Sequence, residues 1–231
     1  QSKYNLSDIS IKEITPMFIT DFELYLRTTC KCGYNTTAKF MQFFKRIIII
    51  ARNNGILVGD PFASYKIRLE KVDRGYLTED EIKIILKKKM VSERLEHVRD
   101  LFVFSCFCGL AYSDVANLRQ ENIQKSFDGN LWIITRRKKT NTESNIRLLD
   151  VPKCIIEKYK GLARDGHVFP VPSNGSCNKI LKDIGRQCGF KVRLTYYVAR
   201  HTNATTVLLS HGVPIETVSS MLGHKSIKTT Q

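Results

Sequence analysis

One segment of this 231-residue chain has the pattern of a β-hairpin, and it limits the folds that the rest can adopt. It reads LWIITRRKKTNTESNIRLLDVP, with strand-forming residues at 131–135 and 146–151. The polar run KKTNTESN between them predicts a turn, so the two stretches pair as antiparallel strands. The rest of the chain has helical spacing, which predicts a mainly α-helical protein with a small antiparallel β-sheet. The hairpin carries four consecutive basic residues: Arg136, Arg137, Lys138 and Lys139.

The helices are predicted from apolar spacing and from their start and stop signals. Pro16 suits the start of a first helix, and a long helix follows over residues 36–53, ended by Gly55. In that long helix we expect an apolar face toward a core: Phe40, Phe43, Phe44, Ile47, Ile48 and Ala51. We expect its basic side chains to face outward: Lys39, Lys45, Arg46 and Arg52. Further helices are expected at 79–89, 92–109, from about 113, and at 153–164, 175–188, 197–210 and 214–222.

A charged connector divides the chain into two predicted domains, 1–74 and 75–231. Asp60-Pro61 cannot continue a helix, and the stretch from Lys66 to Arg74 is charged and expected to be extended. Thr78 and Glu81 then form a capping box that starts the second domain. The first domain is predicted to be entirely helical, and the hairpin falls in the second.

The net charge of the chain indicates a polyanionic partner. Lys and Arg number 37 against 22 Asp and Glu, which gives a formal charge of +15 and an isoelectric point near 9.6. Residues 1–74 carry +5 and residues 75–231 carry +10, so both domains favour the same partner. Nucleic acid is the first candidate, and a basic protein without such a partner is the alternative. No apolar run is long enough to span a membrane and no signal peptide is present, so we expect a cytoplasmic protein that binds no membrane.

Several kinds of chemistry have no motif here. The seven cysteines are scattered or form C-x-C pairs, which favours reduced, mostly buried thiols over a zinc site. The sequence contains neither a phosphate-binding loop of the Walker type nor an H-E-x-x-H helix. We therefore expect no cofactor and no metal.

The segment LTYYVARHTNATTVLLSHGVPIETVSSMLGHKSIKTTQ places two polar candidates around a helix–turn–helix. Arg200 lies near the start of one predicted helix, and His224 follows the end of the next. The turn at Gly212-Val213-Pro214 between them can bring the two side chains together.

These motifs resemble those of the tyrosine recombinases, the phage integrase family. YVARHTNAT and MLGHKSIKTTQ are similar to its second catalytic box, and LFVFSCFCGLAYSDVANL is similar to its first. The stretches GLAYSDV and VARHT are also similar to integrases and transposases of mobile elements in the Bacteroidetes. The resemblance implies a helical, SAM-like core-binding domain at 1–74 and a catalytic domain at 75–231. It also implies a nucleophilic tyrosine two residues beyond Gln231, so that residues 75–231 lack the nucleophile segment of the catalytic domain.

The resemblance implies roles for individual residues. Strand cleavage builds negative charge on phosphorus without a metal, so it needs fixed cations. Arg200 would bind the phosphate oxygens as a fork, and His224 would donate to a non-bridging oxygen or assist the tyrosine proton. Lys139, or its neighbour Lys138, would protonate the departing 5′-oxygen. Asp114 would support the site, and three residues of the hairpin would anchor phosphates: Arg136, Arg137 and Lys138.

Three positions depart from the family pattern, and one of them, Asn203, stands where the family usually has an aromatic or hydrophobic residue and concerns local packing. Ala111 stands where the first arginine belongs, which would cost roughly a thousandfold in rate unless another cation replaces it. Arg99 is the expected replacement, the alternative being an ion pair with Glu96 or Asp100. Tyr197 stands where the family has a histidine, and we expect it to donate a hydrogen bond.

We therefore expect a site-specific DNA recombinase or integrase of a mobile element, acting through a 3′-phosphotyrosyl intermediate for integration, excision or inversion. The two domains would form a C-shaped clamp on double-stranded DNA that carries a recombination site, and a homotetramer would assemble there. The 36–53 helix would approach the major groove, and its basic residues would bind DNA: Lys39, Lys45, Arg46 and Arg52. Such a protein would be associated with the bacterial nucleoid. The alternatives are a catalytically impaired DNA-binding protein derived from this family and a type IB topoisomerase-like enzyme.

Overall fold

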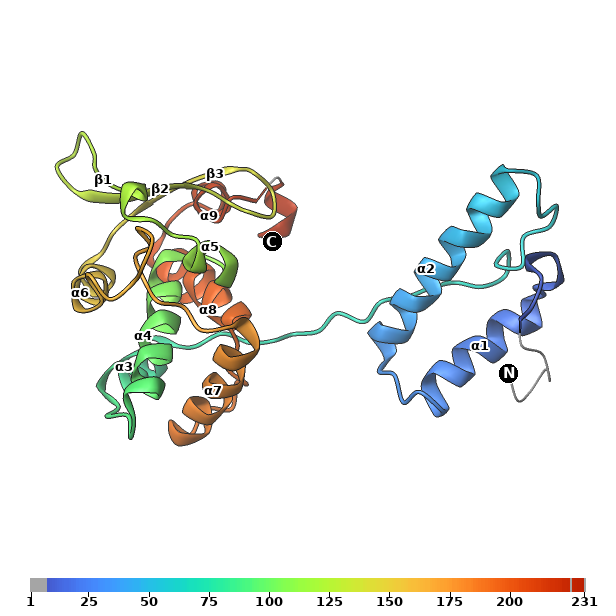
Figure 1. The fold of residues 1–231 in the computed structure, drawn as a ribbon, viewed down its shortest axis with the longest axis horizontal. Coiled ribbons are helices and arrows are strands. Elements are labelled where there is room, and N and C mark those ends of the chain that lie inside the picture. The colour runs from blue at the N-terminus through green and yellow to red at the C-terminus, as the bar shows by residue number, and fades with distance from the viewer. Residues whose placement is uncertain (1–7, 225, 231) are drawn as a thin grey trace. The chain divides into compact units, whose positions relative to one another are not determined.

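The computed structural model describes residues 8–224 and 226–230 and divides the chain into two units, Gln1–Asp73 and Arg74–Gln231. Figure 1 shows that the first unit is helical and that the second combines helices with a small sheet. The predicted fold class, mainly α with a small antiparallel β-sheet, is confirmed. Within the described residues, no helix is long and apolar enough to cross a membrane.

The first unit is built on two helices, α1 (Pro16–Thr28) and α2 (Tyr34–Asn53), after a short 3₁₀ turn, η1 (Ile11–Glu13). The hydroxyl of Thr15 accepts from the backbone N–H of Phe18 at 3.2 Å, and Pro16 occupies the first turn, so α1 starts where the sequence predicts. A small core forms between the helices and the following loop: Ile19, Leu26, Met41, Ile48 and Phe62.

The expected apolar face of α2 is only partly correct. Phe44, Ile48 and Ala51 pack toward the core or are buried, but Phe40, Phe43 and Ile47 are 48%, 66% and 55% exposed. The reason is that apolar residues surround most of this helix, whereas α1 and the 56–67 loop contact one stripe of it. The stripe that packs follows Met41, Phe44 and Ile48, at the spacing of a single helix face.

The second unit starts with α3 (Glu79–Lys87), and the predicted capping box between Thr78 and Glu81 is present. Its centre is α4 (Glu93–Cys108), which contacts α6 (Asp150–Lys158), α7 (Asn174–Gln187) and α8 (Tyr196–Thr202). Nine residues of α4 are buried, so this helix forms the axis of the main core. The remaining elements are α5 (Tyr112–Ala116), η2 (Gln120–Asn122), η4 (Leu209–His211), α9 (Ile215–Met221) and η5 (Ile227–Thr229).

The sheet has three antiparallel strands in the order β1 (Ile123–Lys125), β2 (Leu131–Arg136) and β3 (Glu143–Arg147). Ile133 of β2 lies opposite Ile146 of β3, and both are fully buried. The sequence predicted the second strand of the hairpin, β3, at 146–151, but β3 ends at Arg147. Residues 150 and 151 instead belong to α6, which starts at Asp150 and has Pro152 in its first turn, where proline is tolerated. All seven cysteines are unpaired; three are buried, two half-buried and two exposed.

The helix expected at 197–210 is divided into α8, a π-helical turn η3 (Asn203–Leu208) and the 3₁₀ turn η4. Polar contacts with other parts of the second unit accompany the change. The amide of Asn203 donates to the carbonyl of Phe107 at 3.0 Å, and the Thr202 and Thr206 hydroxyls bond the backbone of Leu77. Wide turns of this kind occur frequently at functional sites.

Candidate active site

Arg200, on the last turn of α8, is the centre of the site. Its Nη1 donates to the carbonyl of Gly109 at 2.7 Å, and its Nη2 donates to the carbonyl of Leu222. Gly109 ends α4 with φ at 67°, and Leu222 caps α9, so the guanidinium lies between the carboxyl ends of two helices. Carbonyls at helix ends carry partial negative charge and lack partners within their own helix, which makes them suitable acceptors for a buried guanidinium.

His224 contacts this guanidinium directly. Its Nε2 lies 3.1 Å from Nη2 of Arg200, and its Nδ1 lies 2.8 Å from the hydroxyl of Thr230. Because a guanidinium can only donate, Nε2 accepts and the proton of the neutral ring is assigned to Nδ1. Burial, followed by the charges of Arg200 and Arg137, lowers the pKa of His224 to about 4. The imidazole is therefore neutral at physiological pH.

Arg137, which follows β2, is the second guanidinium of the site. Its Nη1 donates to the carbonyl of Gly223 at 3.3 Å, next to the Leu222 carbonyl that binds Arg200, while its buried Nε has no hydrogen-bond partner. Gly223 has φ at +60°, and a Cβ there would lie 3.3 Å from the Arg137 side chain. Glycine thus suits both the left-handed backbone and the close approach of the hairpin.

The two guanidinium groups repel each other. Burial, and then the charge of Arg137, lowers the pKa of Arg200 to about 10, although Asp114 acts in the opposite direction. Asp114 is buried on α5, and its Oδ1 accepts from the backbone N–H of Lys138 at 3.1 Å. This bond ties α5 to the hairpin turn. Among the residues that the structure describes, neither Arg200 nor Arg137 forms an ion pair with a carboxylate. The cluster therefore has an excess of positive charge and is suited to bind an anion.

Comparison with known proteins identifies the family. A model of the phage integrase family matches residues 75–231, and a model of the phage integrase SAM-like domain matches residues 2–67. The chain belongs to the phage integrase family. It is thus an enzyme of the tyrosine recombinase family, as the motifs of its second domain predicted.

Individual relatives agree with this assignment. The chain is 26% identical to a tyrosine recombinase of Pseudothermotoga lettingae, over 97% of this chain and 79% of that protein. It is 22% identical to the tyrosine recombinase XerC of Oceanobacillus iheyensis, over 98% of this chain and 76% of that one. A lambda integrase dimer bound to a COC′ core site shares the fold, with a TM-score of 0.78 at 17% identity over 99% and 82% of the two chains. The Tn1549 transposon integrase in complex with a circular intermediate DNA has a TM-score of 0.73 at 16% identity, and the match covers 98% of this chain and 82% of that one.

The structure of this phage integrase family member does not bring Arg99 to the cluster. Arg99 lies in the first half of α4, ten residues and therefore about 15 Å of helix before Gly109. Its Nε donates to Asp100 at 2.6 Å and its Nη1 to the carbonyl of Lys88 at 2.9 Å, while Glu96 lies 3.5 Å away. The expectation that Arg99 replaces the arginine missing at Ala111 is not supported, and the alternative of an ion pair describes its environment.

The remaining predicted catalytic residues lie at the surface. Lys139, like Lys138, is exposed in the turn between β2 and β3. Tyr197 is half exposed on α8, with its ring 4.5 Å from that of His201. Tyr197 is also near the cluster, because it precedes Arg200 by three residues on α8.

The residues predicted to bind DNA have different environments. Lys39, Arg46 and Arg136 are exposed. The ammonium of Lys45 lies 5.7 Å from the centre of the Phe62 ring, and Arg52 forms a 3.0 Å ion pair with Asp60. Lys45 and Arg52 therefore also stabilise the first unit, by connecting α2 to the loop that follows it.

The sequence interpretation treated Arg137 only as a phosphate anchor and missed its place in the cluster. A signal was present, because side chains alternate along a strand and residues two apart share a face. Arg137 is four residues beyond the buried Ile133, so continued alternation places it on the same, inward face. Arg136 falls on the opposite face and is exposed.

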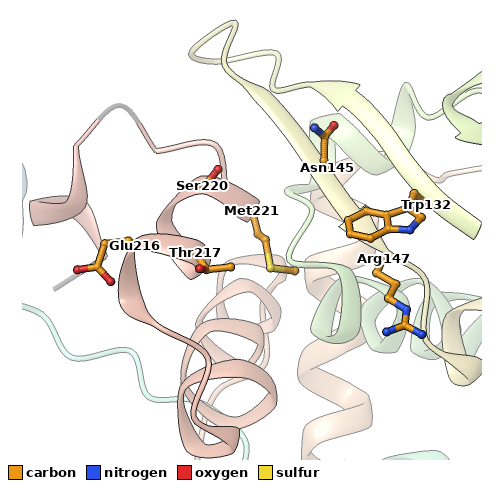
Figure 2. A pocket seen from close by; sticks show the side chains of 7 residues that line it. All are labelled: Trp132, Asn145, Arg147, Glu216, Thr217, Ser220 and Met221. Carbon is orange, nitrogen blue, oxygen red and sulfur yellow. The ribbon is translucent and has the colours of Figure 1, made fainter. Parts of the chain in front are cut away.

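A separate groove lies between α9 and the strands β2 and β3. It has a volume of about 490 Å³ and is lined by Trp132, Asn145, Arg147, Glu216, Thr217, Ser220 and Met221. Figure 2 shows the lining residues of α9 on one side of the groove and those of the strands on the other. It contains none of the clustered residues, so it is not part of the candidate site.

Proposed function

We propose that this protein is a site-specific recombinase that cuts and rejoins double-stranded DNA through a 3′-phosphotyrosyl intermediate. The observation that carries the proposal is the cluster of Arg200, Arg137 and His224, in which two guanidinium groups and one imidazole are held by backbone carbonyls and by each other. A phosphodiester that gains charge during transesterification requires such preorganised donors. Bond energy is conserved in this reaction, so no nucleotide cofactor and no metal are required.

Each member of the cluster has a role in this scheme. Arg200 binds the non-bridging oxygens of the scissile phosphate, and Arg137 acts as the second arginine in place of Ala111. The Nε of Arg137 is buried without a hydrogen-bond partner, so this guanidinium has an unused donor in the free protein. His224 receives the tyrosine proton, or donates to a third oxygen once its Nε2 is protonated; a bound phosphate favours that protonation, because it would raise the pKa of the ring from its value near 4.

Two further residues act from the rim of the site. Lys139, with Lys138 as the alternative, is carried by the hairpin turn and protonates the departing 5′-oxygen. Asp114 fixes that turn through its bond to the backbone of Lys138. Tyr197 donates a hydrogen bond to the phosphate from the half-exposed side of α8.

The domain roles follow the family. Residues 1–74 act as the core-binding domain, with Lys39 and Arg46 available to DNA phosphates, and residues 75–231 carry the catalytic cluster. The +15 charge supports salt-sensitive binding to DNA. One solved neighbour is a lambda integrase tetramer bound to a Holliday junction, which supports a homotetramer on two recombination sites. We place the protein in the cytoplasm, on the nucleoid.

A mobile-element role is the finer part of the proposal. It is supported by the similarity of GLAYSDV and VARHT to Bacteroidetes integrases and by the fold shared with a transposon integrase. Sequencing the DNA on both sides of the gene tests this role. Terminal repeats and a joined circular form would support an integrase, whereas a single chromosomal site would contradict it.

A trapping experiment tests the reaction itself. The natural full-length protein is incubated with duplexes from a random-sequence library that carry one nick, so that cleavage releases a short oligonucleotide and leaves the protein attached. A covalent protein–DNA band whose peptide carries phosphotyrosine is the expected result. Retarded DNA without a covalent band would favour the DNA-binding alternative, and relaxation of any supercoiled plasmid would favour the topoisomerase alternative.

A further inference from the structure

The start of the second unit is fixed to the helix that carries Arg200. The side chain of Leu77 is fully buried, and its backbone N–H donates to the Thr202 hydroxyl at 3.0 Å. Its carbonyl accepts from the hydroxyl of Thr206. Both threonines are buried, so the segment is attached to α8 and η3 by two shielded hydrogen bonds.

The residues before Leu77 follow the same surface. Gly75 has φ at +66°, and a Cβ added there would lie 3.0 Å from Val192. Arg74 places its guanidinium carbon 4.7 Å from the centre of the Tyr197 ring, the geometry of a cation–π contact. Residues 74–77 therefore form a strap along α8 and η3, from Tyr197 to Thr206.

The ring beneath Arg74 borders the active site. Tyr197 precedes Arg200 by three residues on α8, so the two side chains are neighbours on the helix surface. The Tyr197 ring also lies 4.5 Å from that of His201, whose charge lowers the pKa of His224. A half-exposed tyrosine next to a phosphate site has several rotamers available, and contacts with Arg74 and His201 restrict them.

We propose that Arg74 is a positioning residue for DNA cleavage, which holds Tyr197 so that its hydroxyl is directed at the scissile phosphate. The inference rests on the proposed recombinase function. It assigns an active-site task to the segment that joins the two domains, because the strap residues 74–77 belong to that connection. Arg74 acts through the tyrosine ring and does not itself need to contact the reacting atoms.

The test measures single-turnover cleavage of a nicked duplex by the full-length protein, at saturating protein concentration. Arg74→Ala is expected to lower the cleavage rate about five- to tenfold with little change in DNA affinity, since a cation–π contact contributes about 1 kcal/mol. Arg74→Lys, which keeps a cation over the ring, is expected to recover most of the rate. The matched control is Lys71→Ala, which removes an exposed cation of the same connector and leaves the saturated rate unchanged.

A double-mutant cycle with Tyr197→Ala separates positioning from direct action. If Arg74 works through the ring, Arg74→Ala has no further effect once the ring is removed. A rate loss of equal size in both backgrounds would overturn the positioning role, as would a wild-type rate for Arg74→Ala. Failure of the wild-type protein to form any covalent product would instead contradict the proposed function.

Discussion

Two arginine groups in the second unit show how the environment of a cation indicates its task. Arg99 is 12% exposed and is bound by carboxylates, with Asp100 at 2.6 Å and Glu96 at 3.5 Å. Asp100 in turn accepts from Lys158 at 2.7 Å and from Tyr159 at 2.9 Å. The charges of this group balance locally, and its bonds connect α4 to α6.

The group around Arg200 also contains arginines, but its positive charges are in excess over its negative charges. Arg200 and Arg137 are held by carbonyls, which carry only partial charge. The charge of Arg137 contributes to lowering the pKa of Arg200, and the charges of both arginines contribute to lowering that of His224. A partly buried positive charge that forms no ion pair with a carboxylate is costly to the free protein and is favourable when an anion arrives. From this difference between the groups we propose that Arg99 serves stability and that Arg200 and Arg137 bind phosphate.

The largest effect is expected at Arg200. Arg200→Ala removes the donor that joins α4, α9 and the phosphate, and it should reduce covalent trapping by at least about a thousandfold. Arg200→Lys should also be severely impaired, because an ammonium keeps the charge but loses the fork. Trapping on nicked duplexes measures both variants, and near-normal product from Arg200→Ala would contradict the site assignment.

The next largest effect is expected at Arg137. Arg137→Ala should lower the cleavage rate by roughly a hundredfold or more, since it removes a cation from the transition state. Arg136→Ala is the matched control, because this neighbour is exposed and should change only the affinity for DNA and its salt dependence. Single-turnover rates at saturating protein distinguish the two variants, and equal rates would remove Arg137 from the site.

Arg99→Ala is expected to change stability and not catalysis. It leaves Asp100 buried with fewer partners, so the free energy of unfolding should fall by about 2 kcal/mol. Arg186→Ala breaks an exposed arginine–aspartate pair with Asp183 and should cost less than about 1 kcal/mol. Urea denaturation compares the two. A stable Arg99→Ala protein that no longer cleaves would reverse the comparison between the two arginine groups.

The smallest effect concerns pH. The pKa of His224 is about 4 in the folded protein, below the ordinary value of about 6.5, so the unfolded chain binds a proton first as the pH falls. The contribution of the neutral ring to stability is thus complete above pH 6.5 and is lost as the pH falls toward 4. Denaturation between pH 4.5 and 7.5 should show a weaker pH dependence for His224→Gln than for the wild type. Identical slopes would show that His224 is not held neutral.

The sequence predicted what is local and missed what depends on tertiary packing. The hairpin, the capping box and the pair Arg200 and His224 were predictable because each lies within a short motif with its own start or turn signal. The place of Arg137 beside Arg200 depends on strand direction and on the close approach allowed by Gly223. Helical spacing suggested Arg99 for the site, but spacing alone does not show which carboxylates lie alongside.

The exposed face of α2 illustrates a second limit. Apolar residues around most of a helix do not reveal which stripe is covered, because that depends on the elements that pack against it. The π-helical turn after α8 likewise forms next to contacts with Phe107 and Leu77, which are about 100 residues or more away in the sequence.

The most direct test of the account observes the arginines themselves. In ¹⁵N-labelled protein, the Nε–H resonances of Arg99, Arg137 and Arg200 are assigned with single Arg→Lys variants and followed during titration with inorganic phosphate, and then with a short duplex. If Arg200 and Arg137 form the phosphate site, their resonances shift together while that of Arg99, bonded to Asp100, stays in place. A shift at Arg99 with no change at Arg137 would contradict this assignment.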